Sequence, residues 1–465
     1  MEDFKTNKAH SLYTKRDKLY TKVIKTRSQS QRLLLAGLVY GLFISLPWIS
    51  LGDRPLIYFN LGARQFHIFW LTFWPQDFMF LAWALIIAAF SLFLFTTVAG
   101  RLWCGYICPQ TIWTLLFIWI EEKIEGSPSQ RKKLDKELMN PSKLTKKSVK
   151  HAIWLSISII TGFSFVAYFY PAPNLLIDLI RFNLPTPAIV ALLGFTYLTY
   201  LDAGWLREQV CVYMCPYAKF QSVMYDEDTL IVSYNGIKGE PRGSLKSDNR
   251  GQCIDCKECV HVCPTGIDIR DGVQIECINC ALCLDVCSDV MALTKQPQDL
   301  ITFTTLKAQE STVDKKQMPT PAKQLLKQSI LRSKTLAYIA VLSIFTGLFA
   351  YKLAVRTPLE VSIIPSREPI YRMINASTVA NEYNIKIANK SDVSIEVTIK
   401  TSSEIFNIQG TRQTIIEGND TYEANLQITS SADQHGPVPF KITVHIENSD
   451  ISTSLNTRFV YPPSK

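Results

Sequence analysis

The hydrophobic pattern of this chain consists of long uncharged windows separated by polar and basic stretches. Four windows of at least 18 residues contain no Asp, Glu, Lys or Arg, namely Leu33–Leu51, Phe78–Val98, Ala152–Tyr170 and Leu184–Leu201. A fifth window, Thr335–Tyr351, is also uncharged. About 20 apolar residues cross a bilayer core, and these windows lack the polar stripe that helices of a soluble core keep. The pattern therefore predicts five transmembrane helices.

Lys and Arg are distributed unevenly around these spans. The connection Gly52–Asp77 contains only Arg54 and Arg64, and the third connection contains only Arg181. Many more lie in the N-terminal segment and after the second span: Lys5, Lys8, Lys15, Arg16, Lys18, Lys22, Lys25, Arg27, Arg32, Arg131, Lys132, Lys133, Lys136, Lys143, Lys146, Lys147 and Lys150. Because basic flanks stay in the cytoplasm, we expect the N terminus, the loop after the second span and the segment after the fourth on that side. The C terminus is then outside.

The net charge of +9 follows from the same basic runs. Every run adjoins a predicted span, which favours anionic lipid over nucleic acid as its partner. The first window follows a polar stretch without a cleavage site for a signal peptidase, so we expect it to remain in the protein as a membrane anchor.

All twelve cysteines lie between Cys104 and Cys287, on the side or edge of the membrane predicted to be reducing. This distribution favours metal ligands over disulfides. Eight of them form two copies of the spacing C-x2-C-x2-C-x3-C, which is typical of bacterial ferredoxins with two 4Fe–4S clusters. The fourth cysteine of each copy is expected to bind the other cluster. One predicted ligand set is Cys253, Cys256, Cys259 and Cys287, and the other is Cys263, Cys277, Cys280 and Cys283.

Zinc is the competing interpretation of these eight thiols, but zinc ribbons use cysteine pairs rather than closely spaced triplets. The second copy departs from the ferredoxin pattern at one position, because Ser288 stands where the first copy has Pro264. His261 lies inside the first copy, and we interpret it as a turn residue because four cysteines already complete that site.

The remaining cysteines form a second repeat, C-x3-C-P, after each of two predicted spans. The first copy is Cys104 and Cys108 with Pro109, and the second is Cys211 and Cys215 with Pro216. If helical, cysteines four apart share one face of the helix, and two such faces can converge into a four-sulfur site. The chemistry of thiolates favours Cu(I), zinc or a further iron–sulfur centre there. The alternative is that they are small buried hydrophobic residues. Met214 is a further candidate ligand or a packing residue.

These patterns divide the chain into segments. The region after the fifth span has alternating apolar and polar positions, as in Tyr383–Ile387 and Phe440–Ile446, with turn residues between the runs. Such alternation predicts a β-sandwich of immunoglobulin-like architecture. The predicted order is a basic N-terminal segment (1–32), a four-helix membrane domain (33–206), a ferredoxin-type domain with a linker around Ala308–Lys327 (207–334), a fifth transmembrane helix (335–353) and an exported sandwich (354–465).

With these parts assembled, the chain resembles the cytochrome c oxidase accessory protein family, also called FixG, CcoG or RdxA-like membrane polyferredoxins. The resemblance covers nearly the whole chain and includes both cysteine repeats. It implies an inner-membrane protein of bacteria that reduces Cu(II) to Cu(I) for the assembly of a cbb3-type haem-copper oxidase. It implies that Cys253 to Cys287 bind two 4Fe–4S clusters. It further points to Cys104, Cys108, Cys211 and Cys215 as the thiols that handle copper.

Three functions follow as hypotheses. The first is a metalloreductase whose exported sandwich contacts oxidase subunits or a copper chaperone. The second is an electron relay between the quinone pool and another protein, and the third is an assembly scaffold with structural clusters. No G-x-G-x-x-G follows a predicted strand, so electrons are expected from an unidentified partner. His435 and His445 of the sandwich are interpreted as surface or packing residues, and a homodimer is left open.

Overall fold

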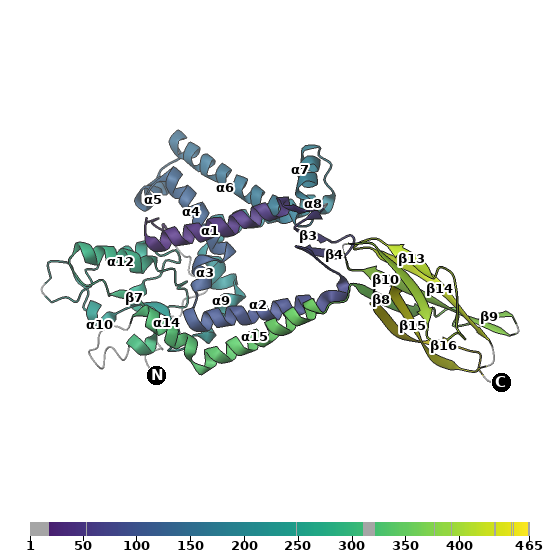
Figure 1. Ribbon diagram of the computed structural model, residues 1–465. Helices are drawn as coiled ribbons and strands as arrows, with labels where there is room; N and C mark the ends of the chain where they lie inside the picture. Colours follow the sequence, from purple (N-terminus) through teal and green to yellow (C-terminus); the bar gives the residue numbers. More distant parts are fainter. Residues whose placement is uncertain are drawn as a thin grey trace. The chain divides into compact units, whose positions relative to one another are not determined.

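The computed structural model describes residues 18–463 except 53, 248, 310–320, 376, 392, 432–433, 448 and 450. Lys5, Lys8, Lys15 and Arg16 of the predicted basic segment lie outside the described residues, as does most of the predicted linker. The chain divides into two compact units, drawn in Figure 1. Unit 1 comprises Met1–Trp70 and Phe78–Gly347, and unit 2 comprises Leu71–Asp77 and Leu348–Lys465.

Helices make up the first part of unit 1. They are α1 (Arg27–Ser45), α2 (Phe78–Ala99), α3 (Leu102–Tyr106), α4 (Pro109–Glu125), α5 (Pro128–Lys136), α6 (Pro141–Ala167), α7 (Ala172–Ile180), α8 (Thr186–Leu201) and α9 (Pro216–Met224). A further long helix, α15 (Ser333–Ala354), follows the cysteine-rich part, and its last residues belong to unit 2. Prolines at the first position and polar caps define several starts, because the first N–H groups of a helix have no partner within it. Asn140, for example, accepts a hydrogen bond from the Lys143 N–H at the start of α6.

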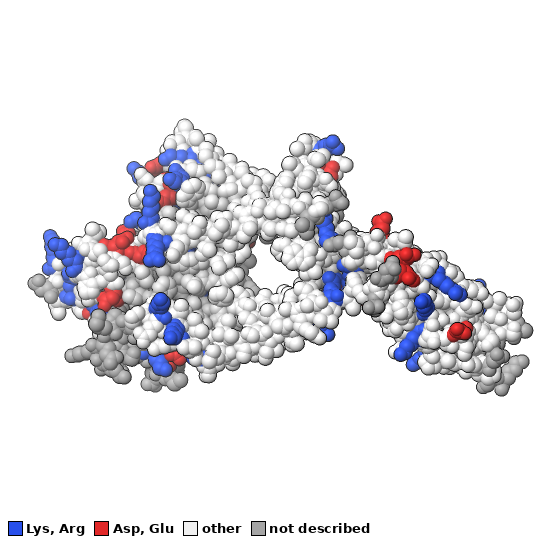
Figure 2. Space-filling view, viewed as in Figure 1, with Lys and Arg blue, Asp and Glu red and all other residues white. Residues whose placement is uncertain are grey.

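Within the described residues, six helical stretches are long and apolar enough to cross a membrane, judged by length and composition. Five correspond to the predicted windows. The sixth is Leu102–Glu125, which α3 and α4 form together with a break at Cys108. Figure 2 shows that the face of α2 and α15 turned to the viewer carries almost no charged side chains along its middle. The structure thus has several apolar helices that suit a membrane, whereas their number in the bilayer and their sidedness stay predictions.

The cysteine-rich part of unit 1 follows α9. Its elements are β6 (Ile231–Tyr234), α10 (Gly236–Gly239), α11 (Glu258–His261), the short 3-10 turn η6 (Ile269–Asp271), α12 (Leu282–Leu293), β7 (Ile301–Thr304) and α14 (Ala322–Leu331). Strands β6 and β7 pair antiparallel, with Val232 opposite Phe303. A buried cluster that includes Val232, Met291 and Leu300 packs this pair against α12 and several cysteines.

Unit 2 contains two antiparallel sheets that face each other. One sheet has the order β12-β14-β10-β8, with β9 also paired to β10, and the other has the order β13-β11-β15-β16. The strands are β8 (Leu359–Pro365), β9 (Arg372–Asn375), β10 (Thr378–Asn389), β11 (Ile395–Thr401), β12 (Asn407–Gln409), β13 (Gln413–Ile416), β14 (Thr421–Ser431), β15 (Pro437–Ile446) and β16 (Ser452–Val460). Alternate residues of both sheets, such as Ile385 and Val444, form one buried core. The predicted β-sandwich is present.

Candidate functional site

The two cysteine loops of the ferredoxin part have the same backbone shape. In the first loop Asp255 and Lys257 adopt positive φ angles of 51° and 58°, and in the second Asn279 and Ala281 adopt 53° and 61°. These residues occupy equivalent positions, and a helix starts directly after each pair. Left-handed residues turn the chain tightly, so each loop curls around a central space before its helix begins.

The cysteines of the two loops surround two cavities. Cys253, Cys256, Cys259 and Cys287 line the first, together with Tyr234, Arg270 and Leu300. Cys263, Cys277, Cys280 and Cys283 line the second, and Cys259 also touches it. The structure thus groups the thiols in the two predicted sets, each set taking one cysteine from the other loop. Eight thiols in this arrangement fit two 4Fe–4S clusters, and the ligand role of each cysteine stays a prediction.

Burial controls the protonation of these thiols. It raises the pKa of Cys259, Cys277 and Cys287 to about 12 in the absence of iron. Iron binding must therefore displace protons from the thiols, as metal binding to cysteine generally does. Arg270 supports the first loop, since its guanidinium donates to Asp255 and Asp268 at 2.6 Å each.

The C-x3-C-P repeats do not form continuous helices. Cys104 lies in α3, whereas Cys108 follows that helix and precedes Pro109, the first residue of α4. Cys211 lies in the π-helical turn η5 (Val210–Met214), and Cys215 precedes Pro216, the first residue of α9. A residue before proline avoids the helical region. Each pair therefore does not lie in one continuous helix, which was the condition for a shared helical face, and each second cysteine instead directly precedes a new helix.

The other thiols of the two repeats nevertheless interact electrostatically with Cys211. The pKa of Cys211 is raised to about 12, mainly because the thiol is buried. The thiols of Cys108 and Cys104 raise this pKa further, and Cys215 adds a smaller contribution. Cys104 is buried and donates to Gln221 Oε1 at 3.4 Å. In the described part of the chain, no three His, Cys, Asp or Glu side chains converge closely enough to hold a single metal ion.

Helix α3 packs directly against the second cysteine loop. A side chain on Gly105 would meet Ile278 O at 2.6 Å, so only glycine allows this approach. The Tyr106 hydroxyl donates to Cys280 O at 3.5 Å, and Cys104 shares a buried cluster with Ile278 and Cys280. Cys104 and the second cavity therefore belong to one packed region.

Two π-helical turns, η4 (Asp202–Leu206) and η5, lie on either side of Arg207, and the second contains Cys211. Arg207 itself has a positive φ of 44°. Its guanidinium donates to Glu121 at 2.9 Å, and its backbone oxygen accepts from Gln110 at 3.2 Å. Single π turns and left-handed bulky residues are frequent at functional sites. Their position beside Cys211 marks this segment as part of the site.

Sequence reasoning missed two arginines of this site. Arg32 was counted only as a positive charge beside the first span, and Arg101 was not considered. Arg32 is fully buried and donates from Nε to Gly105 O at 2.8 Å. Arg101 is also buried and donates to Gln221 at 3.0 Å and to Ile275 O. The only signal in the sequence was their position, because Arg32 directly precedes the first apolar window and Arg101 follows the second.

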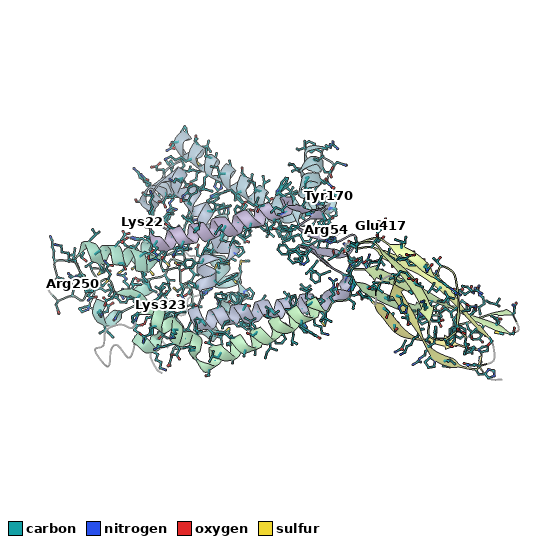
Figure 3. The ribbon with its side chains drawn as sticks, in the orientation of Figure 1. Lys22, Arg54, Tyr170, Arg250, Lys323 and Glu417 are labelled. Carbon is teal, nitrogen blue, oxygen red and sulfur yellow. The ribbon has the colours of Figure 1, made fainter. Side chains whose placement is uncertain are left out.

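Other side chains predicted as secondary candidates lie apart from the cavities. His261 is exposed, and its carbonyl accepts from the Lys22 N–H at 3.0 Å. Lys22, labelled in Figure 3, pairs with Glu258 at 2.8 Å. Met214 is 61% exposed. His445 lies in β15 of unit 2, and His435 precedes that strand.

Comparisons with known protein families agree with this architecture. Residues 206–306 match a family described as a 4Fe-4S dicluster domain, and residues 81–126 match a 4Fe-4S binding domain. Residues 349–462 match a family described as an IG-like fold at the C-terminal of FixG. The second match includes Cys104 and Cys108, so iron–sulfur families cover both kinds of cysteine repeat.

Curated relatives extend over most of the chain. Protein RdxB of Cereibacter sphaeroides is 36% identical over 405 residues, which are 85% of this chain and 84% of the relative. Protein RdxA of the same organism is 35% identical over 82% of this chain and 81% of its own. Nitrogen fixation protein FixG of Rhizobium meliloti is 35% identical over 81% of this chain and 78% of its own. The chain therefore belongs to the family of FixG, RdxA and RdxB, and it is an iron–sulfur electron-transfer protein of the membrane.

Proposed function

We propose that this protein is a cupric reductase that converts Cu(II) to Cu(I) for delivery to a cbb3-type cytochrome c oxidase during assembly. Copper is the substrate, and Cys104, Cys108, Cys211 and Cys215 are the thiols that hold it. Thiolate ligands favour Cu(I) over harder ions, so the same residues that receive the ion also retain the product.

The contact between α3 and the second cysteine loop is the observation that carries this proposal. Cys104 and Cys280 belong to the same buried cluster, and no solvent layer separates their backbones because Gly105 lies against Ile278. Clusters bound at the eight ferredoxin cysteines would supply electrons one at a time, and Cu(II) needs one electron. Of the four copper thiols, Cys104 is shielded from water, since Gln221 and Arg101 are buried beside it.

The cellular arrangement belongs to the same proposal. The basic residues beside the spans favour a cytoplasmic N terminus and ferredoxin part, with unit 2 in the periplasm of a bacterium. Unit 2 then offers a β-sandwich to oxidase assembly factors or a copper chaperone. Membrane lipid surrounds the apolar helices, and a homodimer is compatible with this arrangement.

The experiment compares Cys104→Ser and Cys211→Ser with the wild-type protein after anaerobic purification. We expect both variants to keep about eight irons per chain. The proteins are reduced with dithionite, freed of the excess reagent by gel filtration and then given Cu(II). Both variants should lose most of the reduction of Cu(II), measured with a Cu(I)-specific chelator. Met214→Leu is the matched control, because Met214 lies between Cys211 and Cys215 in the sequence but its side chain is mostly exposed. Full copper reduction in both cysteine variants would contradict the proposal.

A further iron–sulfur centre at the four membrane-edge thiols is the second candidate. The match of residues 81–126 to a 4Fe-4S binding domain favours it. About twelve irons per wild-type chain, falling to about eight in Cys104→Ser, would assign these thiols to a third cluster instead of copper. Oxidase assembly at the wild-type level in both cysteine variants would leave only the scaffold hypothesis.

A further inference from the structure

A separate pocket lies beside the second cysteine cavity. Residues of α1, α4, η5 and the segment before η5 line it, including Arg32, Thr114, Glu208 and Cys211. Its volume is about 30 Å³, compared with about 20 Å³ for each cysteine-lined cavity. The pocket is therefore at least as large as the cavities that fit an iron–sulfur cubane.

Two buried hydrogen-bond donors of this pocket have no partner among the described residues. Arg32 uses Nε for Gly105 O and Nη1 for Gln29 Oε1 at 3.3 Å, but its Nη2 bonds to nothing. The Thr114 hydroxyl is also buried and unpaired. Burying a donor without an acceptor destabilises a protein. The pocket is therefore built for a ligand with acceptor oxygens.

The charged and apolar side chains that line the pocket indicate the chemical class of that ligand. Arg32 and Arg207 both line the pocket, and guanidinium groups keep their proton in proteins and can only donate hydrogen bonds, so they favour a ligand with acceptor atoms. The Glu208 carboxylate opposes a strongly anionic ligand. Leu115 and Ile118 of α4 add apolar surface from a stretch long enough to span a membrane. The best match is a neutral, lipid-soluble molecule with carbonyl or hydroxyl oxygens.

The pocket also adjoins a redox centre. Thr265 and Ile278 line both this pocket and the second cysteine cavity, so they form a shared wall. The Thr265 hydroxyl lies 3.3 Å from Cys263 Sγ, and Ile278 lies between Cys277 and Cys280 in sequence. Arg32 also acts electrostatically on Cys280. A ligand in this position can exchange electrons across one layer of side chains.

We infer that this pocket binds the ring of a membrane quinol, which is the electron donor of the protein. Oxidation of one quinol to quinone releases two electrons and two protons. The two 4Fe–4S clusters, when bound, take one electron each, and the protons leave the two ring hydroxyls through Glu208 to bulk water. Arg32 and Thr114 donate to the oxygens of the resulting quinone. The direction of electron flow rests on the proposed function, whereas the binding site does not depend on copper.

The test uses the full-length protein with its clusters, in detergent and without copper. Binding of decylubiquinone is measured by equilibrium dialysis for the wild type, Thr114→Val and Arg32→Gln. We expect the dissociation constant to rise about fivefold in Thr114→Val and more than tenfold in Arg32→Gln, because the first loses a neutral and the second a charged hydrogen bond. Thr161→Val is the matched control, since Thr161 is buried in α6 and its hydroxyl is bonded to Tyr40 and Ile157.

Cluster reduction gives a second measurement. Decylubiquinol should reduce the clusters of the wild type and of Thr161→Val, followed by electron paramagnetic resonance, and should do so at least several-fold more slowly in the two pocket variants. Wild-type protein that does not bind decylubiquinone would overturn the inference, as would equal affinities in Thr114→Val and Thr161→Val. Arg32-dependent binding of phosphatidylglycerol in place of decylubiquinone would overturn it in favour of a lipid headgroup site. Copper reduction by protein that has been pre-reduced with dithionite and freed of the reagent tests the proposed function separately, because it bypasses the quinol.

Discussion

At the scale of single residues, each cysteine loop depends on two left-handed residues that are not glycine. The cysteine spacing in the sequence predicts which thiols group together, because two-residue gaps leave room for only one compact loop around each cavity. The left-handed residues were not predictable, since Asp255, Lys257, Asn279 and Ala281 share no residue type. Such backbone strain costs about 1–2 kcal/mol for each residue, so interactions within the closed loop must offset it.

The exchange of the fourth cysteine between loops leads to a prediction. Cys287→Ser should remove a ligand from the cavity of Cys253, whereas Cys263→Ser should remove one from the other cavity. Iron should fall from about eight towards about four atoms per chain in each variant, and the electron paramagnetic resonance signals that remain should differ between the two.

Ser288→Ala is the control for this pair, since it changes the neighbour of Cys287 and no thiol. It should keep the iron content of the wild type. The same residual signal in Cys287→Ser and Cys263→Ser would mean that both cysteines bind one cluster, contrary to the grouping in the structure.

At the scale of elements, helix α4 differs most from what its sequence suggests. The apolar run Thr111–Ile120 is too short to span a bilayer alone, and charged residues follow it directly. The helix nevertheless continues to Glu125, because buried cations neutralise its last turn. Glu121 lies 2.9 Å from Arg207, 3.4 Å from Arg131 and 3.5 Å from Lys150. Hydrophobicity alone was unable to predict this continuation, since the partners come from three other segments.

Removing the central carboxylate of this cluster should destabilise unit 1. In Glu121→Gln the buried side chains of Arg131, Lys150 and Arg207 lose a shared anion, and breaking a buried ion pair from one side costs about 3–5 kcal/mol. We expect a clearly lower thermal denaturation midpoint in detergent, measured by light scattering or circular dichroism. Glu122→Gln, next along the helix, is the control. Glu122 is partly exposed, and its carboxylate lies 4.0 Å from the Arg131 guanidinium, farther than the 3.4 Å of Glu121. Equal midpoints for both variants would show that the cluster adds no stability.

At the scale of the whole molecule, the sequence predicted the kinds of part correctly: apolar helices, a dicluster ferredoxin part and an Ig-like sandwich. Windows without charge and doubled cysteine spacings act locally, so they can be recognised without the fold. The composition of unit 2 was not predictable in the same way. Leu71–Asp77 precede the second apolar window, yet they belong to unit 2 together with residues nearly 300 positions later. Only the fold pairs Asp77 with Arg356 at 2.5 Å and with Lys390 at 2.8 Å.

This ion pair makes the stability of the sandwich depend on a residue far from it in sequence. Asp77 and Lys390 are buried, with side chains 8% and 7% exposed. Asp77→Asn therefore removes the carboxylate that Arg356 and Lys390 share in a region with little access to water. A buried pair broken in this way loses several kcal/mol. Hydrogen–deuterium exchange of the full-length protein should therefore become faster in peptides from β8 and β10. Glu423→Gln is the matched control, because its pair with Lys386 is exposed and such pairs contribute about 0–1 kcal/mol. Unchanged exchange in Asp77→Asn would mean that residues 356–463 hold the sandwich together without the segment that precedes α2.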